Sequence, residues 1–354
     1  MKLTPGQLYF INEQDIKTGA RTSYYKIGIV RDAEGRDSKD RLLEHQTGNP
    51  RKLCVVEGLN MPAVEYIETN LHYLFARNRV MGEWMEFTPD ELKNAIAKAN
   101  ELKAEMETYL PDFTKAEQLK KVASNGIKLA PTHDSEYWYG VIQDLKEVIQ
   151  TCQEALGQYD DYLLEAIEQG VDVSAVAKVQ KRAGAKKFDE KLFASKYPDL
   201  YKQHSTSEPD YKGQFRIAPA KDWNPDISSI NPEQVELVTD FMDLLENADH
   251  SLDTGFALHE KHLAVLEVLQ YAEWRTEIAN IKLRVITGEN DGIEGICTWK
   301  REKIEKVTLD RKTLQEKFPD EYNSCVVEGK ETQALIVEPK IYANFDNNSL
   351  KSGN

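Results

Sequence analysis

Two pairs of polar side chains in the first quarter of the chain are of types that act on phosphodiesters. Arg41 and His45 are four residues apart, and so are Glu68 and His72. On an α-helix this spacing places both members of a pair on one face. Hydrolysis of a phosphodiester needs a base near the attacking water, a cation on the phosphate and stabilisation of the leaving oxygen. A guanidinium, an imidazole and a carboxylate are groups of these kinds, whereas we expect His72 to have a structural role.

The residues around these pairs predict a compact unit of strands and helices. Residues 7–11 and 24–30 are rich in aromatic and β-branched residues and should form a hairpin, and residues 52–56 a third strand. Asp40 is a suitable cap for the helix that carries Arg41. Helices are predicted over 40–46, 62–76 and 89–110.

The charge distribution argues against attraction of nucleic acid by the molecule as a whole. The 354 residues have a formal net charge of −15, of which residues 1–90 carry −1 and the remainder −14. Contact with phosphate must therefore be local, and we expect it in the first 90 residues. No apolar run reaches membrane-spanning length, and the start of the chain lacks the apolar core of a signal peptide. We therefore expect a cytoplasmic protein without a membrane partner.

Neither the cysteines nor the histidines form a metal-binding motif. The four cysteines lie far apart in the sequence and should be reduced packing residues. His259 and His262 are three residues apart, unlike the four-residue spacing of the HExxH motif in zinc hydrolases. We expect both on a helix surface.

A repeat in the second half of the chain predicts an internal duplication. Residues 189–201 and 310–322 share Asp, Lys, Lys, Pro, Asp and Tyr at a constant offset of 121. Chance similarity of two helix ends is the alternative. We predict two related α-rich accessory modules, at 135–219 and 229–340, after a helix and linker at 91–134.

Five short motifs follow one another in the opening region. They are LYF at 8–10, KIG at 26–28, RLxxHQTGNP at 41–50, ExxLHxxF at 68–75 and GEW at 82–84. In this order they resemble the phage-associated branch of the GIY-YIG nuclease superfamily, and the resemblance covers residues 6–88. It implies a small sheet-and-helix nuclease domain at 1–90, and with the accessory modules an α+β fold.

The resemblance also implies an endonuclease site that cuts DNA with Mg²⁺ or Mn²⁺. Tyr9 would activate the water or relay its proton, Arg41 would clamp the phosphate, and His45 would assist as a polar or proton-transfer group. Glu68 would hold the metal ion, because a hard divalent ion suits one carboxylate with retained waters and phosphate oxygens. Lys26 departs from the family, in which many active members have a tyrosine there. This lysine would bind phosphate, or act as a base if desolvated.

Structural roles compete with these assignments. Tyr9 would also serve as a core aromatic, and Arg41 and Glu68 would also serve as partners in an ion pair. Glu83 would complete an acidic metal shell or simply be solvated. Tyr25 should face the opposite side of its strand from the adjacent lysine, because side chains alternate along a strand.

A basic rim and the acidic modules complete the functional predictions. The rim residues would contact phosphate, although scattered basic residues usually form a solvated face. They are Lys26, Arg41, Arg51, Lys52, Arg77 and Arg79. The leading prediction is a metal-dependent DNA endonuclease. The alternative is a non-catalytic DNA-binding protein whose acidic modules hold a protein partner, in a phage, mobile-element or defence context. A third is an acidic scaffold or DNA-mimicking inhibitor.

The second accessory module carries DGIEG at 291–295 and TWK at 298–300 before its copy of the repeat. With these motifs, residues 279–340 resemble the segment downstream of the nuclease core in YqaJ-type viral recombinases. The acidic and lysine residues of that core have no recognisable counterpart upstream. The resemblance therefore implies an accessory module and a phage or mobile-element context; an acidic interaction domain is the alternative.

Overall fold

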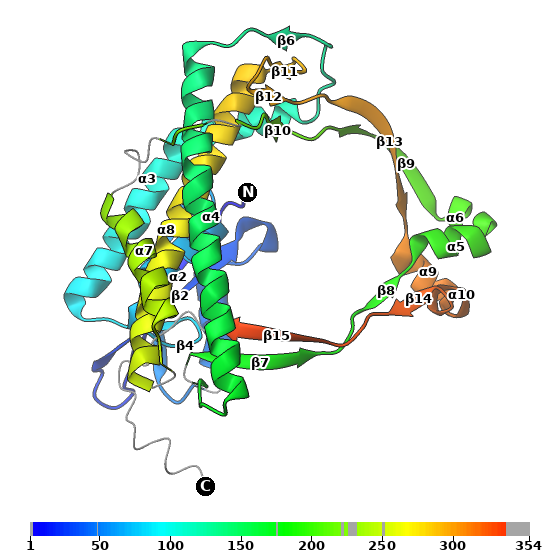
Figure 1. Ribbon diagram of the computed structural model, residues 1–354. Helices are drawn as coiled ribbons and strands as arrows, with labels where there is room; N and C mark the ends of the chain where they lie inside the picture. Colours follow the sequence, from blue (N-terminus) through cyan, green and yellow to red (C-terminus); the bar gives the residue numbers. More distant parts are fainter. Residues whose placement is uncertain are drawn as a thin grey trace.

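The computed structural model confirms the α+β class and has three parts: an N-terminal sheet with helices, a body of long helices, and two β-ribbons that meet at a helical tip (Figure 1). None of the described helices is long and apolar enough to cross a membrane. The predicted module boundaries at 229 and 340 lie outside the described residues. The structure describes residues 3–47, 49–174, 176–220, 223–225, 232–249 and 252–337.

The N-terminal part is built on an antiparallel sheet of five strands in the order β3-β1-β2-β5-β4. The strands are β1 (Gly6–Gln14), β2 (Arg21–Arg31), β3 (Lys52–Met61), β4 (Arg79–Met81) and β5 (Trp84–Glu86). Strands β1 and β2 form the predicted hairpin. Alternate residues of β1 face opposite sides, with Leu8 and Phe10 in one buried cluster and Tyr9 and Ile11 in another.

Helices cover both faces of this sheet. Helix α1 (Ser38–Gln46) packs on the face that holds Tyr9, whereas α2 (Val64–Leu74) and α3 (Pro89–Leu119) cover the other. The short helices are η1 (Asp32–Glu34) and η2 (Ala76–Asn78). The cap of α1 is Asp37 and not the predicted Asp40: the side chain of Asp37 accepts from two backbone amides, and Asp40 completes a capping box at the third helical position.

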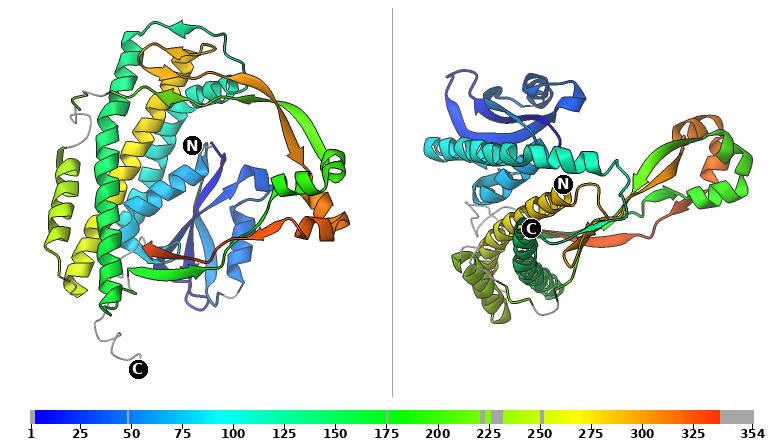
Figure 2. Two further views of the ribbon diagram at one scale, coloured as in Figure 1. Left: turned by 45° about the vertical axis from the view of Figure 1, so that its right-hand side comes forward. Right: turned by 90° about the horizontal axis from the view of Figure 1, so that it is seen from above.

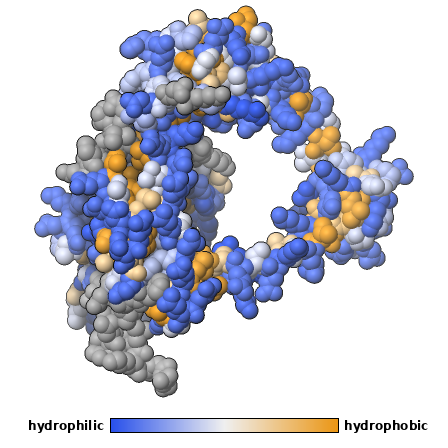
Figure 3. All heavy atoms as spheres, viewed as in Figure 1, coloured by the Kyte–Doolittle hydropathy of each residue, from blue (hydrophilic) through white to orange (hydrophobic). Residues whose placement is uncertain are grey.

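Two ribbons project from the helical body and close a ring at the tip, and Figure 3 shows an opening through the molecule between them. One ribbon pairs β9 (Ser205–Lys212) with β13 (Glu302–Leu309). The other pairs β7 (Ala177–Arg182) with β15 (Thr332–Val337) and β8 (Lys186–Phe188) with β14 (Val326–Glu328). A four-stranded sheet in the order β10-β12-β11-β6 lies at one end of the body. Its strands are β6 (Lys128–Leu129), β10 (Arg216–Ile217), β11 (Gly292–Ile293) and β12 (Cys297–Thr298).

The tip consists of two copies of one helix pair, at the positions of the sequence repeat. Its helices are α5 (Glu190–Lys196), α6 (Pro198–Gln203), α9 (Arg311–Lys317) and α10 (Pro319–Asn323). Asp189 and Asp310 cap the first helix of each copy. The amide of Asp189 donates to the carbonyl of Cys325 at 2.8 Å, and the amide of Asp310 donates to the carbonyl of His204 at 2.9 Å. These bonds are equivalent under the offset of 121, so the copies face each other about a local two-fold axis.

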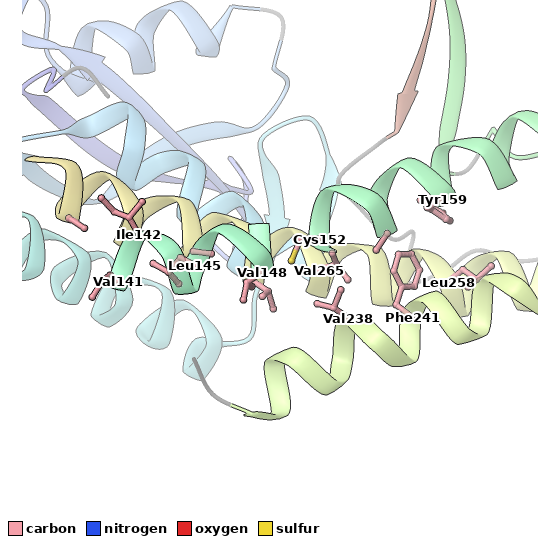
Figure 4. Close-up of a cluster of buried hydrophobic side chains, with 14 of the residues drawn as sticks. Val141, Ile142, Leu145, Val148, Cys152, Tyr159, Val238, Phe241, Leu258 and Val265 are labelled. Carbon is pink, nitrogen blue, oxygen red and sulfur yellow. The ribbon is translucent and has the colours of Figure 1, made fainter. Parts of the chain in front are cut away.

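Because each ribbon takes one strand from each copy, the segments predicted as separate modules are interleaved. The body itself is formed by α4 (His133–Glu168), α7 (Pro232–Glu246) and α8 (Leu252–Thr287), whose apolar side chains interdigitate in Figure 4. His259 and His262 are 0 % and 5 % exposed within this core, so the expected surface position is wrong. The hydroxyl of Tyr159 lies 3.1 Å from Nδ1 of His259.

Trp274 on α8 joins the body to the N-terminal part. Its ring stacks on Phe113 of α3 with centroids 5.9 Å apart and packs on Tyr66 of α2 at 4.5 Å. Figure 2 shows α3 between the sheet and the long helices of the body. Trp274 is 4 % exposed, so this contact excludes water from the junction.

Replacing Trp274 by alanine should lower the free energy of unfolding by about 3–5 kcal/mol, the usual cost of truncating a buried tryptophan. The matched control is Trp223→Ala, at a ring that is 40 % exposed, where we expect about 1 kcal/mol or less. Urea titrations followed by circular dichroism measure both. Equal losses would show that the junction does not depend on Trp274.

Candidate active site

Tyr9 occupies the centre of the sheet and depends on a glycine in the neighbouring strand. It lies opposite Gly28 of β2 and Gly58 of β3, and it is 1 % exposed. A Cβ atom on Gly28 would lie 2.6 Å from the Tyr9 hydroxyl and 2.7 Å from its Cζ atom. The phenol ring therefore covers residue 28 and fills the space that a side chain there would take. Tyr9 is a buried aromatic, but its hydroxyl reaches polar groups.

Helix α1 brings Arg41 and His45 to this hydroxyl. The Tyr9 oxygen lies 3.4 Å from Nε2 of His45, and Arg41 interacts with Tyr9 by hydrogen bonding and by charge. The ion-pair partner of Arg41 is Glu44 at 2.7 Å and not Glu68. The Nε atom of Arg41 is buried and has no hydrogen-bond partner among the described residues. Such a donor needs an acceptor, and a phosphate oxygen would be one.

Burial keeps both proton-carrying groups of this cluster uncharged. It raises the pKa of Tyr9 above its ordinary value, although the nearby Arg41 acts in the opposite direction. It lowers the pKa of His45, and the positive charges of Lys26 and Arg41 lower it further. At neutral pH the phenol therefore keeps its proton, and the imidazole has a free acceptor nitrogen.

Lys26 lies on β2 two residues before Gly28, so its side chain is on the same face of the sheet as the Tyr9 ring. Its side chain is buried and forms an ion pair with Glu83, which lies in the turn between β4 and β5. Burial opposes ionisation of Glu83, but the hydrogen bond and charge of Lys26 bring its pKa below the usual value. Tyr25 packs on the other face against Phe87, as predicted from strand alternation.

Helix α2 supplies Glu68 and His72 at the wall of an open hollow of about 400 Å³. Burial, together with the negative charge of Glu83, raises the pKa of Glu68 to about 7. Burial lowers the pKa of His72 to about 4, and its Nε2 atom lies 3.3 Å from the carbonyl oxygen of Ile27. The hollow is lined by Glu68, Thr69, His72, Tyr73, Arg79, Gly82 and Glu83.

The Tyr9 cluster and the hollow at Glu68 approach each other where the pairing of β5 with β2 ends. Strand β5 pairs with β2 only from Tyr24 to Lys26, and the next residue, Ile27, donates its amide to the carbonyl of Glu83 at 3.1 Å. The charges of Glu83 and Glu68 both raise the pKa of Tyr9. The phenol of Tyr9 thus interacts both with the guanidinium of Arg41 and with the carboxylate of Glu68, although Tyr9 and Arg41 do not line the hollow itself.

The predicted basic rim divides into residues near the hollow and residues away from it. Arg79 lines the hollow, whereas Arg77 acts electrostatically on Glu267 of the helical body. Lys52 begins β3 and is six residues from Gly58, the position opposite Tyr9, which is about 20 Å along the strand; Arg51 comes directly before it. Lys26, Arg41 and Arg79 are therefore the basic residues of the candidate site.

The donor set of the hollow fits one divalent ion held largely by solvent. Among the described residues, no group of three or more His, Cys, Asp or Glu side chains is arranged to hold a metal ion. Glu68 is a half-buried carboxylate whose ionisation is opposed by partial burial and by the charge of Glu83, and a cation would relieve that repulsion. An ion with few protein ligands and several waters matches the preference of Mg²⁺.

Two residues of this site were not assigned their roles from the sequence. The KIG motif by itself does not show why its third residue is a glycine. The hairpin register places Gly28 opposite Tyr9, whose ring takes the space of a side chain at position 28. Glu83 was expected to be a solvated residue or part of a metal shell, and it instead pairs with Lys26. The GEW motif could have indicated this ion pair, because Glu83 comes directly before the short strand β5, which pairs with β2 next to Lys26.

Gly28→Ala should disrupt the site, because its Cβ atom would overlap the phenol ring of Tyr9. We expect a loss of about 1–3 kcal/mol from overpacking. Gly58→Ala is the matched control, since it flanks Tyr9 on the other side and its Cβ would lie 3.3 Å from the end of the Gln7 side chain. Urea unfolding of both variants checks the difference; a Gly58 variant as unstable as the Gly28 variant would contradict it.

The raised pKa of Glu68 predicts a dependence of stability on pH. Between the ordinary value of 4.5 and about 7, the unfolded chain ionises before the folded one, so stability falls as pH rises through this window and then levels off. Glu68→Gln should remove the fall and leave the variant more stable than the native chain at pH 8, relative to pH 4. Glu34→Gln should behave oppositely, since Arg36 and Arg31 lower the pKa of Glu34. Unfolding titrations across pH provide the measurement.

The candidate site lies within a segment that matches the model of a protein domain family. Residues 6–100 match the model of the T5orf172 domain, a phage-associated family of nuclease-like domains. Neither the curated proteins nor the solved structures that were searched contain a match to the chain. The match covers the sheet, α1, α2 and the first part of α3, including Tyr9, Lys26, Arg41, His45 and Glu68. It indicates a nuclease-like, DNA-binding domain at this end of the chain.

Proposed function

We propose that the protein is a DNA endonuclease that hydrolyses phosphodiester bonds at the edge of its N-terminal sheet with a divalent metal ion. The observation that supports this most is the electrostatic linkage of three distant side chains. The hydroxyl of Tyr9 interacts with Arg41, and its pKa responds to the charge of Glu68. A phenol can transfer a proton from the attacking water, and a guanidinium and a metal-binding carboxylate can stabilise the charge that develops on the phosphate.

Arg41 is the phosphate clamp in this proposal. Its Nη1 atom is engaged by Glu44, while its Nε donor is buried without a partner among the described residues. Guanidinium groups bind phosphate oxygens through parallel hydrogen bonds. A scissile phosphate that accepts from Nε would satisfy this donor and lie beside the Tyr9 hydroxyl.

Tyr9 and His45 form the proton path. The raised pKa of Tyr9 keeps its proton in place at rest, so the phenol relays a proton instead of acting as a resting phenolate. The uncharged imidazole of His45, 3.4 Å away, accepts the phenolic proton as the phenol takes one from the attacking water. The order of transfer therefore runs from water through Tyr9 to His45.

Glu68 would hold the metal ion in the hollow, with Glu83 nearby. A divalent ion supplies stabilisation of the charge that develops on the phosphate and leaving oxygens. Lys26 contributes positive charge beside Glu83. Because the pKa of Glu68 is about 7, metal binding would compete with protonation, and activity should rise with pH through neutrality.

A non-catalytic DNA-binding protein is the second candidate, and the Lys26–Glu83 ion pair favours it. The lysine occupies the position at which the resembled family often has a tyrosine. Its ammonium group is already neutralised by Glu83, so it does not replace a phenol in proton transfer. A site of this kind would bind the phosphate backbone without cutting it.

Nicking of supercoiled plasmid in Mg²⁺ or Mn²⁺ distinguishes the candidates. Arg41→Ala and Glu68→Ala should each reduce the nicking rate about 10²-fold or more, since each removes a group that stabilises developing charge. Arg36→Ala is the matched control, because Arg36 pairs with the same Glu44 from an exposed position, and it should nick normally. Equal nicking by all four proteins would reject the endonuclease assignment, and salt-dependent DNA retention without nicking would favour the second candidate.

A further inference from the structure

The ribbon formed by β7, β8, β14 and β15 differs in charge from the rest of the acidic C-terminal region. Residues 177–188 contain five lysines and arginines and no aspartate or glutamate, and the paired residues 326–337 add one lysine and two glutamates. The five basic side chains are all exposed. They are Lys178, Lys181, Arg182, Lys186 and Lys187. The two segments therefore have a net positive charge, whereas the whole chain has a net charge of −15.

The second ribbon shows that this charge is not required by the architecture. A single register runs through both ribbons, with Phe188 opposite Val326 and Leu309 opposite Ser205. The ribbon of β9 and β13 carries three lysines and four carboxylates. Under the offset of 121, the positions of Lys181, Lys186 and Lys187 correspond to Glu302, Val307 and Thr308. The same backbone pairing thus forms without the lysines.

The basic ribbon is open to a large ligand. The ribbons and the tip extend away from the helical body in both views of Figure 2, and the space-filling view shows the opening beside the ribbon. Gly184 and Gly329 lie against each other midway along it, where a Cβ on Gly184 would be 1.7 Å from the carbonyl oxygen of Gly329. The two short ladders therefore continue as one slender ribbon, with two glycines in contact at its waist.

We propose that this ribbon is a second nucleic-acid-binding surface, which contacts the phosphate backbone of double-stranded DNA. From Lys178 to Lys187 the strand spans about 30 Å, close to one turn of B-form DNA. The major groove admits a two-stranded ribbon, and the basic side chains of β7 and β8, which alternate between the two faces of the ribbon, would then contact the phosphates along that strand. The rest of the C-terminal region carries a net negative charge, so within that region phosphate is repelled everywhere except at this ribbon.

The ribbon is independent of the candidate active site. Its residues belong to the second half of the chain, outside the matched domain at 6–100. The inference therefore concerns retention of DNA and not its cleavage, and it is tested in EDTA, where no divalent ion is available.

The experiment measures binding of a fluorescein-labelled duplex of about 30 base pairs, three helical turns, by anisotropy at several salt concentrations. The test variant combines Lys181→Gln, Arg182→Gln and Lys187→Gln. We expect about tenfold weaker binding or more near 0.1 M salt, and a slope of log affinity against log salt that is smaller by about 2–3.

The matched control combines Lys212→Gln, Lys303→Gln and Lys306→Gln in the other ribbon. It removes the same charge from a ribbon of the same design, so it should change affinity by less than about twofold and leave the slope unchanged. Equal weakening by both triple variants would overturn the inference, as would native affinity of the test variant or stronger binding of single-stranded DNA or duplex RNA by the native chain.

Lysine acetylation of the native protein provides a second measurement that does not depend on how the variants fold. Added duplex should protect Lys181 and Lys187 from acetylation and should leave Lys303 and Lys306 reactive. Equal protection of both ribbons would contradict the inference. Plasmid nicking is scored separately. A test variant that nicks and keeps native DNA affinity overturns the ribbon assignment alone. A native chain that binds DNA without nicking it, together with weakened binding by the test variant, supports the ribbon without the endonuclease.

Discussion

The approach of the Tyr9 ring to the backbone of Gly28 is the constraint on which the candidate site depends. Helices α1 and α2 lie on opposite faces of the sheet, so Arg41 and Glu68 have no direct route to each other. A side chain on residue 28 would separate them further. Because that position is glycine, the phenol lies across the strand and places a hydroxyl where both helices influence it.

Burial then determines the resting charge of the site. It raises the pKa of Tyr9 and Glu68 and lowers the pKa of His45 and His72, so the uncharged form of each is favoured. The charged groups Arg41 and Lys26 are each paired with a glutamate, Glu44 and Glu83. A site in this condition responds strongly to an incoming phosphate or cation, because either one changes which protonation states are stable.

Local patterns predicted the local structure, and contacts between distant segments limited the rest. The hairpin, the helix of Arg41 and the orientation of Tyr25 follow from residue type and period, which neighbours along the chain determine. Asp40 was mistaken for the cap because Asp37 and Asp40 satisfy the same rule three residues apart. His259 and His262 look like surface residues on α8 alone; packing by α4 and α7 buries them. The pairing of Lys26 with Glu83 required the turn that places β5 beside β2.

The duplication is a second case in which contacts between distant segments determine the structure. Sequence comparison detects two copies, but it does not show that each ribbon takes one strand from each copy. Once the strands are exchanged in this way, the two ribbons have a common register and remain free to differ in side chains. Ion pairs such as that of Glu190 with Arg311, which are equivalent positions of the two copies, hold the tip together across its local axis. The two ribbons share one backbone pairing but differ in charge, so an otherwise acidic region has one positive ribbon. A DNA duplex near it would be repelled by the acidic surroundings and attracted by the ribbon.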